Sequence, residues 1–170
     1  MDIKPLTYNG RDEGIMVTLS TMLKPGDDGS KISEAVMNLF PDASIDSMGE
    51  EAFPSQQNVL IECPHLSVET FLTQIRQQAI LDTAMDAMAK NLDGNTTVFS
   101  ISRLAAFANK ISFTNEEIPL GGCFTIRLEG TGLGDWIEAV TWHNGRQEVP
   151  RQLNDELAMH QDGEASTWHQ

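Results

Sequence analysis

Apolar and polar residues alternate along residues 16–23, the first strongly patterned segment of the chain. Every second position on one side of this segment is apolar or threonine: Val17, Leu19, Thr21 and Leu23. A period of two is typical of a strand with one buried side, so we predict a strand here. The turn-forming run Lys24–Gly29 follows and ends the strand.

The spacing of apolar residues then changes to that of a helix. Apolar positions recur three and four residues apart: Ile32, Ala35, Val36 and Leu39, with Phe40 beside them. This spacing predicts a helix with one buried stripe. Ser30 is placed to cap its first turn, and Pro41 cannot continue it.

Three more elements are predicted in the middle of the chain. A short strand is expected near Ser44–Met48, within a polar and turn-rich stretch, and a stronger one over Asn58–Cys63. After Ser67, a residue suited to capping, apolar residues continue at helical spacing as far as Leu92. We predict one long helix here, with a bend near residues 77–82.

The second half of the chain predicts further strands and short helices. β-Branched and aromatic residues favour strands over residues 96–101, 110–113 and 123–129. Ser102 can cap a short helix that runs to Ala108, and another helical turn or two is expected over residues 135–140.

This mixture of elements predicts a single α+β domain. We place the domain at residues 15–142, an N-terminal extension at residues 1–14, and a polar, acidic, disordered tail at residues 143–170. Apolar residues make up 40% of the 170 residues, enough for one core.

Composition also indicates the compartment. No apolar run reaches the roughly 20 residues that span a bilayer, and the first residues lack the apolar stretch of a signal peptide. We therefore expect a cytoplasmic protein that does not associate with membranes. Cys63 and Cys123 are its only cysteines, so we expect two reduced thiols that face the core rather than a disulfide framework.

The formal net charge is −14, but the excess of acids is uneven. Residues 60–130 carry a net charge of −3, against −6 for residues 1–59 and −5 for residues 131–170. The middle segment also contains the largest number of basic residues. An anionic partner would therefore meet the least repulsion there.

Several short motifs gather in residues 80–130. They are ILDTA at Ile80–Ala84, GNTT followed by Phe99, a basic residue before two alanines at Arg103–Ala106, and EE-PLG at Glu116–Gly121; a weaker one, AVMNLFP, is at Ala35–Pro41. In these motifs the chain resembles the archaeal uncharacterised protein family numbered 0201, which is labelled as predicted RNA-binding. The resemblance covers about residues 15–142. One departure is Leu104, where the family has Gln after the basic residue.

The resemblance implies a two-layer α+β fold, with helices packed on one face of a mostly antiparallel sheet. That fold is similar in outline to the large-subunit ribosomal protein that binds the five-S RNA. The resemblance also implies RNA as a partner.

Basic residues are the first requirement for RNA binding, because phosphate contacts supply much of the affinity. The middle segment provides five candidates: Arg103, Lys110, Arg76, Lys90 and Arg127. Arg103 and Lys110 are the strongest, since they flank the predicted short helix. The alternative is that these are scattered surface cations that pair with the abundant acids.

Aromatic rings are the second requirement, because unpaired RNA bases stack on them. Phe99, Phe113 and Phe124 lie on predicted strands and are candidates for stacking. Burial in the core is the favoured alternative for all three.

Other chemistries lack their usual residue patterns. Cys63 and His65 have no second ligand pair for zinc, and Asp82 and Asp86 are more typical of a solvated helix face than of an acid–base pair. The glycines of residues 130–134 lack the Lys-Ser/Thr ending of a phosphate loop. We therefore expect no catalytic residue, no metal and no small-molecule cofactor.

Three functional classes stay open. The first is an RNA-binding domain, the second is a protein-interaction or homodimerising domain without nucleic-acid binding, and the third is an enzyme of unrecognised type. A contiguous basic surface would favour the first and an apolar surface the second, whereas a pocket with convergent polar groups would favour the third.

Overall fold

The computed structural model of the chain describes residues 8–43, 58–114 and 122–145. Within them, four strands form an antiparallel sheet with the spatial order β2-β1-β4-β3. The strands are β1 (Met16–Leu23), β2 (Val59–Cys63), β3 (Thr96–Ser102) and β4 (Cys123–Glu129). The helices are α1 (Gly29–Leu39), α2 (Glu69–Gln77), α3 (Leu81–Lys90), α4 (Arg103–Phe107) and α5 (Leu133–Val140).

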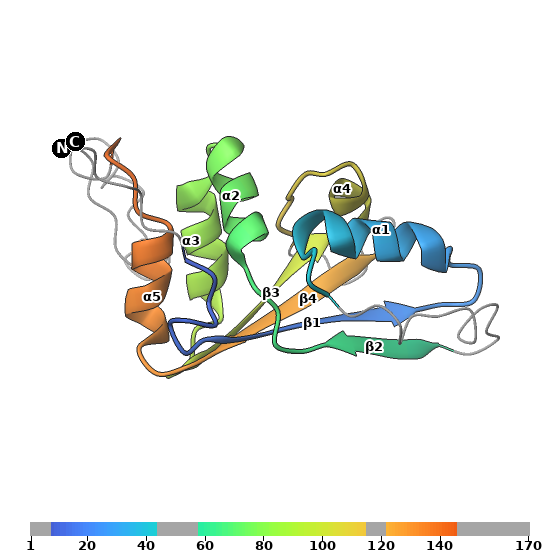
Figure 1. The fold of residues 1–170 in the computed structure, drawn as a ribbon, viewed down its shortest axis with the longest axis horizontal. Coiled ribbons are helices and arrows are strands. Elements are labelled where there is room, and N and C mark those ends of the chain that lie inside the picture. Colours follow the sequence, from blue (N-terminus) through green and yellow to red (C-terminus); the bar gives the residue numbers. More distant parts are fainter. Residues whose placement is uncertain (1–7, 44–57, 115–121, 146–170) are drawn as a thin grey trace, which may run out of the picture.

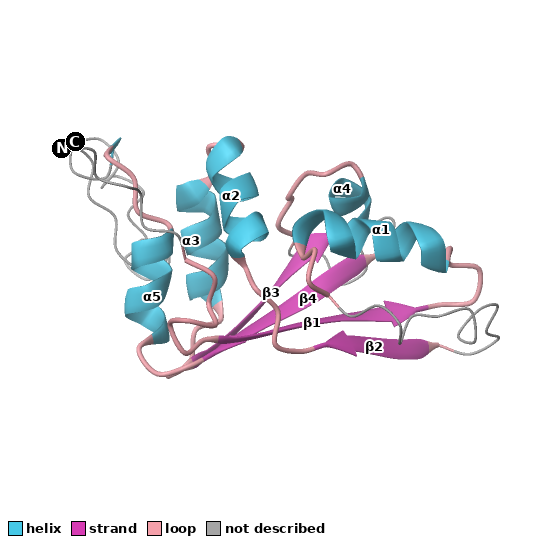
Figure 2. Ribbon diagram, viewed as in Figure 1, coloured by secondary structure: helices cyan, strands magenta, loops and turns pink. Residues whose placement is uncertain are grey.

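The helices lie on one side of the sheet, so the predicted α+β class is confirmed (Figures 1 and 2). Helices α1 and α4 lie over one end of the sheet, and α2, α3 and α5 stand at the other. The core fills the space between the two layers and contains the inward side chains of every strand.

Strand β1 shows why the alternation in the sequence was informative. On the predicted side, Val17, Leu19 and Leu23 are at most 2% exposed, and Thr21 is 4% exposed. The opposite side carries Met16 and Met22, which are 43% and 42% exposed. No described helix covers that second face of the sheet (Figure 1).

Helix α1 has the predicted buried stripe, but its cap was predicted wrongly. The side chain of Asp28, not Ser30, accepts from the backbone N–H groups at the start of the helix, those of Ser30 and Lys31. A carboxylate serves this position well because it also meets the positive end of the helix dipole.

The single long helix predicted after Ser67 is wrong, since the chain forms two helices there. Helix α2 ends at Gln77 and α3 begins at Leu81. Between them Ala79 has a φ of 57°, a left-handed conformation that interrupts a helix. The break falls inside the range where a bend was predicted, and the apolar stripe continues across it.

The strand predicted over residues 110–113 is also wrong. Only an isolated bridge between Ile101 and Phe113 is present. The side chain of Gln78 takes both backbone groups of Ile111: its Oε1 accepts from Ile111 N at 2.7 Å and its Nε2 donates to Ile111 O at 2.9 Å. A residue whose backbone is used in this way cannot extend a ladder of strand hydrogen bonds.

Neither cysteine forms a disulfide, and the two lie on different faces of the sheet. Cys63 is buried, and this burial raises the pKa of its thiol. Cys123 is half-buried and precedes the inward-facing Phe124, so it points to the uncovered face. The prediction of two core-facing thiols is therefore wrong for Cys123.

The described part of the chain begins before the predicted domain boundary. Asn9 accepts a backbone hydrogen bond from Val68, and Trp136 of α5 donates from Nε1 to Glu13 Oε1 at 3.0 Å. These contacts attach residues 9–13 to the domain. The predicted strand near Ser44–Met48 and most of the predicted tail lie outside the described residues.

Candidate nucleic-acid interface

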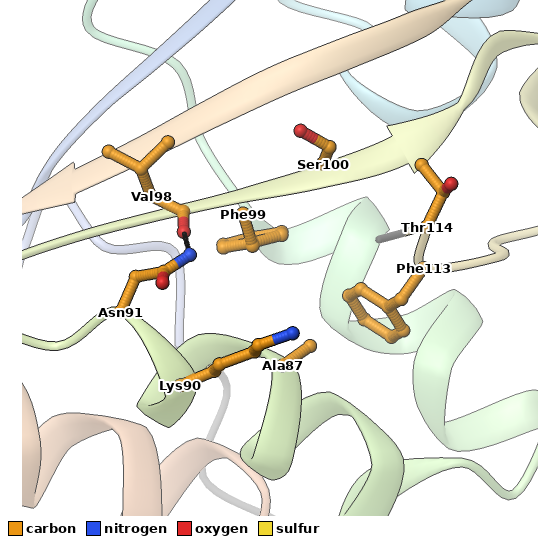
Figure 3. A pocket seen from close by; sticks show the side chains of 8 residues that line it. All are labelled: Ala87, Lys90, Asn91, Val98, Phe99, Ser100, Phe113 and Thr114. Atoms are coloured by element: carbon orange, nitrogen blue, oxygen red, sulfur yellow. Dashed lines mark hydrogen bonds between the residues drawn. The ribbon is translucent and has the colours of Figure 1, made fainter. Parts of the chain in front are cut away.

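A pocket of about 240 Å³ opens beside the edge strand β3 (Figure 3). Its walls come from α3, from β3 and from the segment that follows α4. The lining residues are Ala87, Lys90, Asn91, Val98, Phe99, Ser100, Phe113 and Thr114. Thr97 fixes the distance between two of these walls, because its Oγ1 donates to the carbonyl of Met88 at 2.6 Å.

The outer edge of β3 offers hydrogen-bond donors to this pocket. In an antiparallel pair, successive residues direct their N–H and C=O groups alternately to the partner strand and away from it. The outward carbonyls are occupied: Val98 O accepts from Asn91 Nδ2 at 2.8 Å, and Ser100 O accepts from Thr114 N at 3.0 Å. The outward N–H groups of Val98 and Ser100 have no acceptor among the described residues.

The strand is closed on both sides of these two donors. Thr96 exchanges backbone hydrogen bonds with Asp93 at one end, and Ser102 N donates to Ser112 O at the other. The unpaired stretch is therefore short and lies directly over the pocket (Figure 3).

Two side chains give the pocket its character. Lys90 comes from the last turn of α3, and its side chain extends along this wall of the pocket toward Ala87 (Figure 3). Phe113 is only half-buried, and its ring packs against the rings of Phe71 and Phe99 at centroid distances of 6.5 and 5.8 Å. One wall is thus cationic and another aromatic.

Of the five predicted cations, one lines this pocket and two lie in segments connected to its walls. Lys90 lines it, and Lys110 precedes Ile111 in the segment that carries Phe113. Arg76 lies two residues before Gln78, the residue that binds Ile111 from α2. All three cations have exposed side chains. Their role in RNA binding stays a prediction.

Arg103 has a different position from the one expected of a phosphate contact. It is only 8% exposed. Its Nη1 donates to Thr21 Oγ1 at 3.0 Å and to Met22 O at 3.1 Å, and its Nη2 lies 3.3 Å from Asp27 Oδ2. The guanidinium therefore connects α4 to β1 and to the turn after it, and it does not face solvent.

Arg127 does not line the pocket. It belongs to the uncovered face of the sheet, where it is opposite Thr18 and Val98 in the neighbouring strands. Its Nη2 is 3.8 Å from Glu129 Oε2, in an exposed ion pair. This arrangement fits the alternative of a surface cation paired with an acid.

The other aromatic candidates are buried. Phe99 is 5% exposed and Phe124 is fully buried, so the favoured alternative of core packing is confirmed for both. Only Phe113 among the three stacking candidates reaches the surface.

The residues considered for metal binding or catalysis do not converge. Among the described residues, no group of three or more histidines, cysteines and acids could hold a metal ion. Asp82 is 3.0 Å from His143 Nε2, an interaction that joins α3 to the segment after α5. In the part of the chain that the structure describes, no helix is long and apolar enough to cross a membrane.

Comparison with known proteins places this fold in a family. No family model matches the chain. A UPF0201 protein of Sulfurisphaera tokodaii is 32% identical over 131 residues, which cover 74% of this chain and 88% of that protein. The chain belongs to the UPF0201 family. A second UPF0201 protein, from Pyrobaculum islandicum, is 31% identical over 124 residues and 83% of its length.

Solved UPF0201 structures have the same fold. A crystal structure of the UPF0201 protein from Methanococcus jannaschii superposes with a TM-score of 0.62 at 22% identity, over 76% of this chain and 96% of that one. The family resemblance expected from the motifs of residues 80–130 is therefore confirmed, and so is the archaeal range of the relatives.

Proposed function

We propose that this UPF0201 domain binds RNA along the outer edge of β3. The observation that carries the proposal is a pocket that combines an exposed cation with two backbone donors that have no acceptor among the described residues. Lys90 lines the pocket together with Val98 and Ser100. Lys110 directly precedes Ile111, and Arg76 precedes Gln78, the residue that binds Ile111; both cations are exposed. Phosphate and base oxygens are acceptors, so both features suit the same class of partner.

The pocket supports binding more than catalysis. Its lining contains hydroxyl, amide and ammonium groups, but no carboxylate, histidine or cysteine among the described residues. A general acid or base would have to come from such a group. For this reason we place an enzyme behind a binding domain, even though a pocket is present.

Electrostatics limit how tight the binding is. The chain carries −14, and Asp86 lies one turn before Lys90 on α3. The pocket cation therefore lies close to a carboxylate on an acidic molecule, and long-range attraction of RNA is weak. We expect a moderate affinity that depends on a few phosphate contacts.

A comparison of two variants with equal charge tests the proposal. In the edge variant, Arg76, Lys90 and Lys110 are each replaced by Gln. In the control variant, the exposed cations Lys24, Lys31 and Arg127, none of which lines the pocket, are each replaced by Gln. The affinity for a labelled single-stranded RNA should fall at least tenfold in the edge variant and less than threefold in the control. Equal losses would show that only net charge matters, and no binding by the parent would refute RNA binding.

Self-association through the uncovered sheet face is a second candidate, favoured by one specific pair of residues. Met22 and Leu60 lie opposite each other on neighbouring strands and are 42% and 54% exposed. Adjacent exposed apolar side chains on a sheet face are typical of interfaces. If the face is used, sedimentation velocity should show a dimer for the parent and a monomer for Leu60→Glu. A parent that is monomeric at all concentrations would exclude this candidate.

A further inference from the structure

We propose that the pocket at the β3 edge holds one unpaired nucleotide of single-stranded RNA, bound by the backbone N–H groups of Val98 and Ser100 and by the ring of Phe113. This inference rests on the proposed function, because it names the form of RNA and the atoms that hold it. It adds a site made largely of backbone and aromatic groups to the contacts with phosphates.

The outer edge of β3 offers hydrogen-bond donors only, so it suits a ligand that supplies acceptors. An added peptide strand requires alternating donors and acceptors from the edge strand. Here both carbonyls are already bonded, Val98 O by Asn91 and Ser100 O by Thr114, whereas both N–H groups are unused among the described residues. A peptide would leave its own N–H groups without acceptors, while a ligand rich in oxygen acceptors matches this edge.

The spacing of the two N–H donors limits which group can bind both of them. Two residues of a strand are separated by roughly 7 Å, since each residue rises about 3.3–3.4 Å. One phosphate group is too small to take both N–H groups at this distance. A phosphate oxygen and a base carbonyl of one nucleotide are far enough apart to do so.

The size and lining of the pocket indicate the size of its ligand. Clefts that hold drug-sized ligands measure roughly 300–1,000 Å³, and this one measures about 240 Å³. It therefore suits a single base or nucleotide rather than a larger ligand. Phe113 supplies an aromatic surface at the pocket wall, and Lys90 supplies a cation beside it (Figure 3).

Duplex RNA does not fit this pocket. A base in a duplex is stacked and paired, so its ring and its carbonyl groups are not available to a pocket of this kind. Only a base that is unpaired can enter between α3 and the segment that contains Phe113. We therefore expect preference for single strands.

Hydrogen exchange of individual amides tests the inference directly. The amides of Phe99 and Ile101 pair with β4, so they should exchange slowly with or without RNA. The amides of Val98 and Ser100 should exchange fast in the free protein and at least tenfold more slowly with saturating decauridylate. A blunt RNA duplex at the same concentration should leave both rates unchanged.

Three variants separate the contributions of the aromatic ring and the backbone donor. Phe113→Leu keeps an apolar side chain but removes the ring, and it should weaken decauridylate binding by about 5- to 100-fold, the range for stacking one base. Ser100→Pro removes the N–H donor on an edge where proline is tolerated, whereas Ser100→Ala keeps it. We expect weaker binding only for the proline variant, with thermal unfolding used to confirm that both fold.

These experiments test the single-nucleotide site separately from RNA binding in general. If RNA binds but the exchange of Val98 and Ser100 does not change, the pocket is overturned and RNA binding elsewhere on the edge survives. If duplex and single strand protect these amides equally, the single-nucleotide site is likewise overturned. If no RNA binds to the parent, both proposals fail.

Discussion

Gln78 holds the main chain of Ile111 by two hydrogen bonds, one to each backbone group, at 2.7 and 2.9 Å. The pair lies 33 residues apart in the sequence and connects the end of α2 to the segment that carries Lys110 and Phe113. It fixes the position of that segment relative to the pocket.

Replacement of Gln78 should therefore impair stability and binding together. Gln78→Ala leaves both backbone groups of Ile111 without their partners, and we expect a decrease of about 1–3 kcal/mol in the free energy of unfolding. Single-stranded RNA should also bind more weakly, because Phe113 is no longer held at the pocket. Denaturant unfolding and RNA titration measure the two effects.

The neighbouring residue Gln77 provides a matched control. It is exposed at the end of the same helix, and Gln77→Ala should change the free energy of unfolding by no more than about 0.5 kcal/mol. Similar decreases for Gln77→Ala and Gln78→Ala would contradict the role given to the hydrogen bonds with Ile111.

Arg103 should behave as a structural residue. Arg103→Met removes a charge that is hydrogen-bonded and 8% exposed, and it leaves Asp27 without its ion-pair partner. We expect a decrease on the order of 2–4 kcal/mol in the free energy of unfolding. RNA affinity per folded molecule should not change, and a selective decrease in RNA affinity would instead support the phosphate-binding role predicted from the sequence.

A substitution at Gly122 tests the buried position of the Arg103 side chain independently. Its φ is +83°, and a Cβ there would lie 2.3 Å from Arg103 Nη2. Gly122→Ala should therefore destabilise the fold, and less so in the background of Arg103→Met. For comparison, Arg127→Met breaks only an exposed ion pair, and it should be nearly neutral.

The sequence predicted well those features that depend on neighbours along the chain. The alternation of Val17, Leu19 and Leu23 is a local pattern, and it identified the buried side of β1 correctly. The resemblance of residues 80–130 was equally informative about the family. The structural role of Arg103 could not be predicted from such local patterns, because its partner Asp27 is 76 positions away in the sequence.

The limits of local sequence patterns also explain why two secondary-structure elements were predicted wrongly. The apolar stripe from Val68 to Met88 continues across the break between α2 and α3, so the pattern alone suggested one helix. The strand predicted over residues 110–113 has suitable β-branched and aromatic residues, but Gln78 takes the hydrogen bonds that a strand would need. The pocket itself has no signal in the sequence, since its donors are backbone groups.

The break between α2 and α3 offers a stabilising substitution. Ala79 has a φ of 57°, where a Cβ is unfavourable by roughly 1–2 kcal/mol. Glycine adopts this conformation without that cost, although it loses more entropy on folding. Ala79→Gly should raise the free energy of unfolding by about 0.5–1 kcal/mol, as measured by denaturant unfolding. A decrease would show that the left-handed turn is not retained in solution.

The cysteines should differ in reactivity because they face different sides of the sheet. Cys123 is half-buried on the uncovered face, whereas Cys63 is buried with a raised thiol pKa. The thiolate is the reactive form, so Cys63 should remain unreactive to a thiol reagent at pH values at which Cys123 reacts. Two equally fast thiols in the native protein would contradict the assignment of faces, and Cys123→Ser should remove the fast reaction.

The salt dependence of RNA affinity tests the central claim most directly. For single strands, the slope of log affinity against log salt concentration becomes shallower by about 0.7 for each phosphate group that the protein no longer binds. If Arg76, Lys90 and Lys110 each bind a phosphate, the slope for the edge variant should be shallower than that of the parent by about 2 units. The control variant, with the same change in net charge, should keep the slope of the parent. Identical slopes for the parent and the edge variant would contradict an RNA-binding surface at the β3 edge.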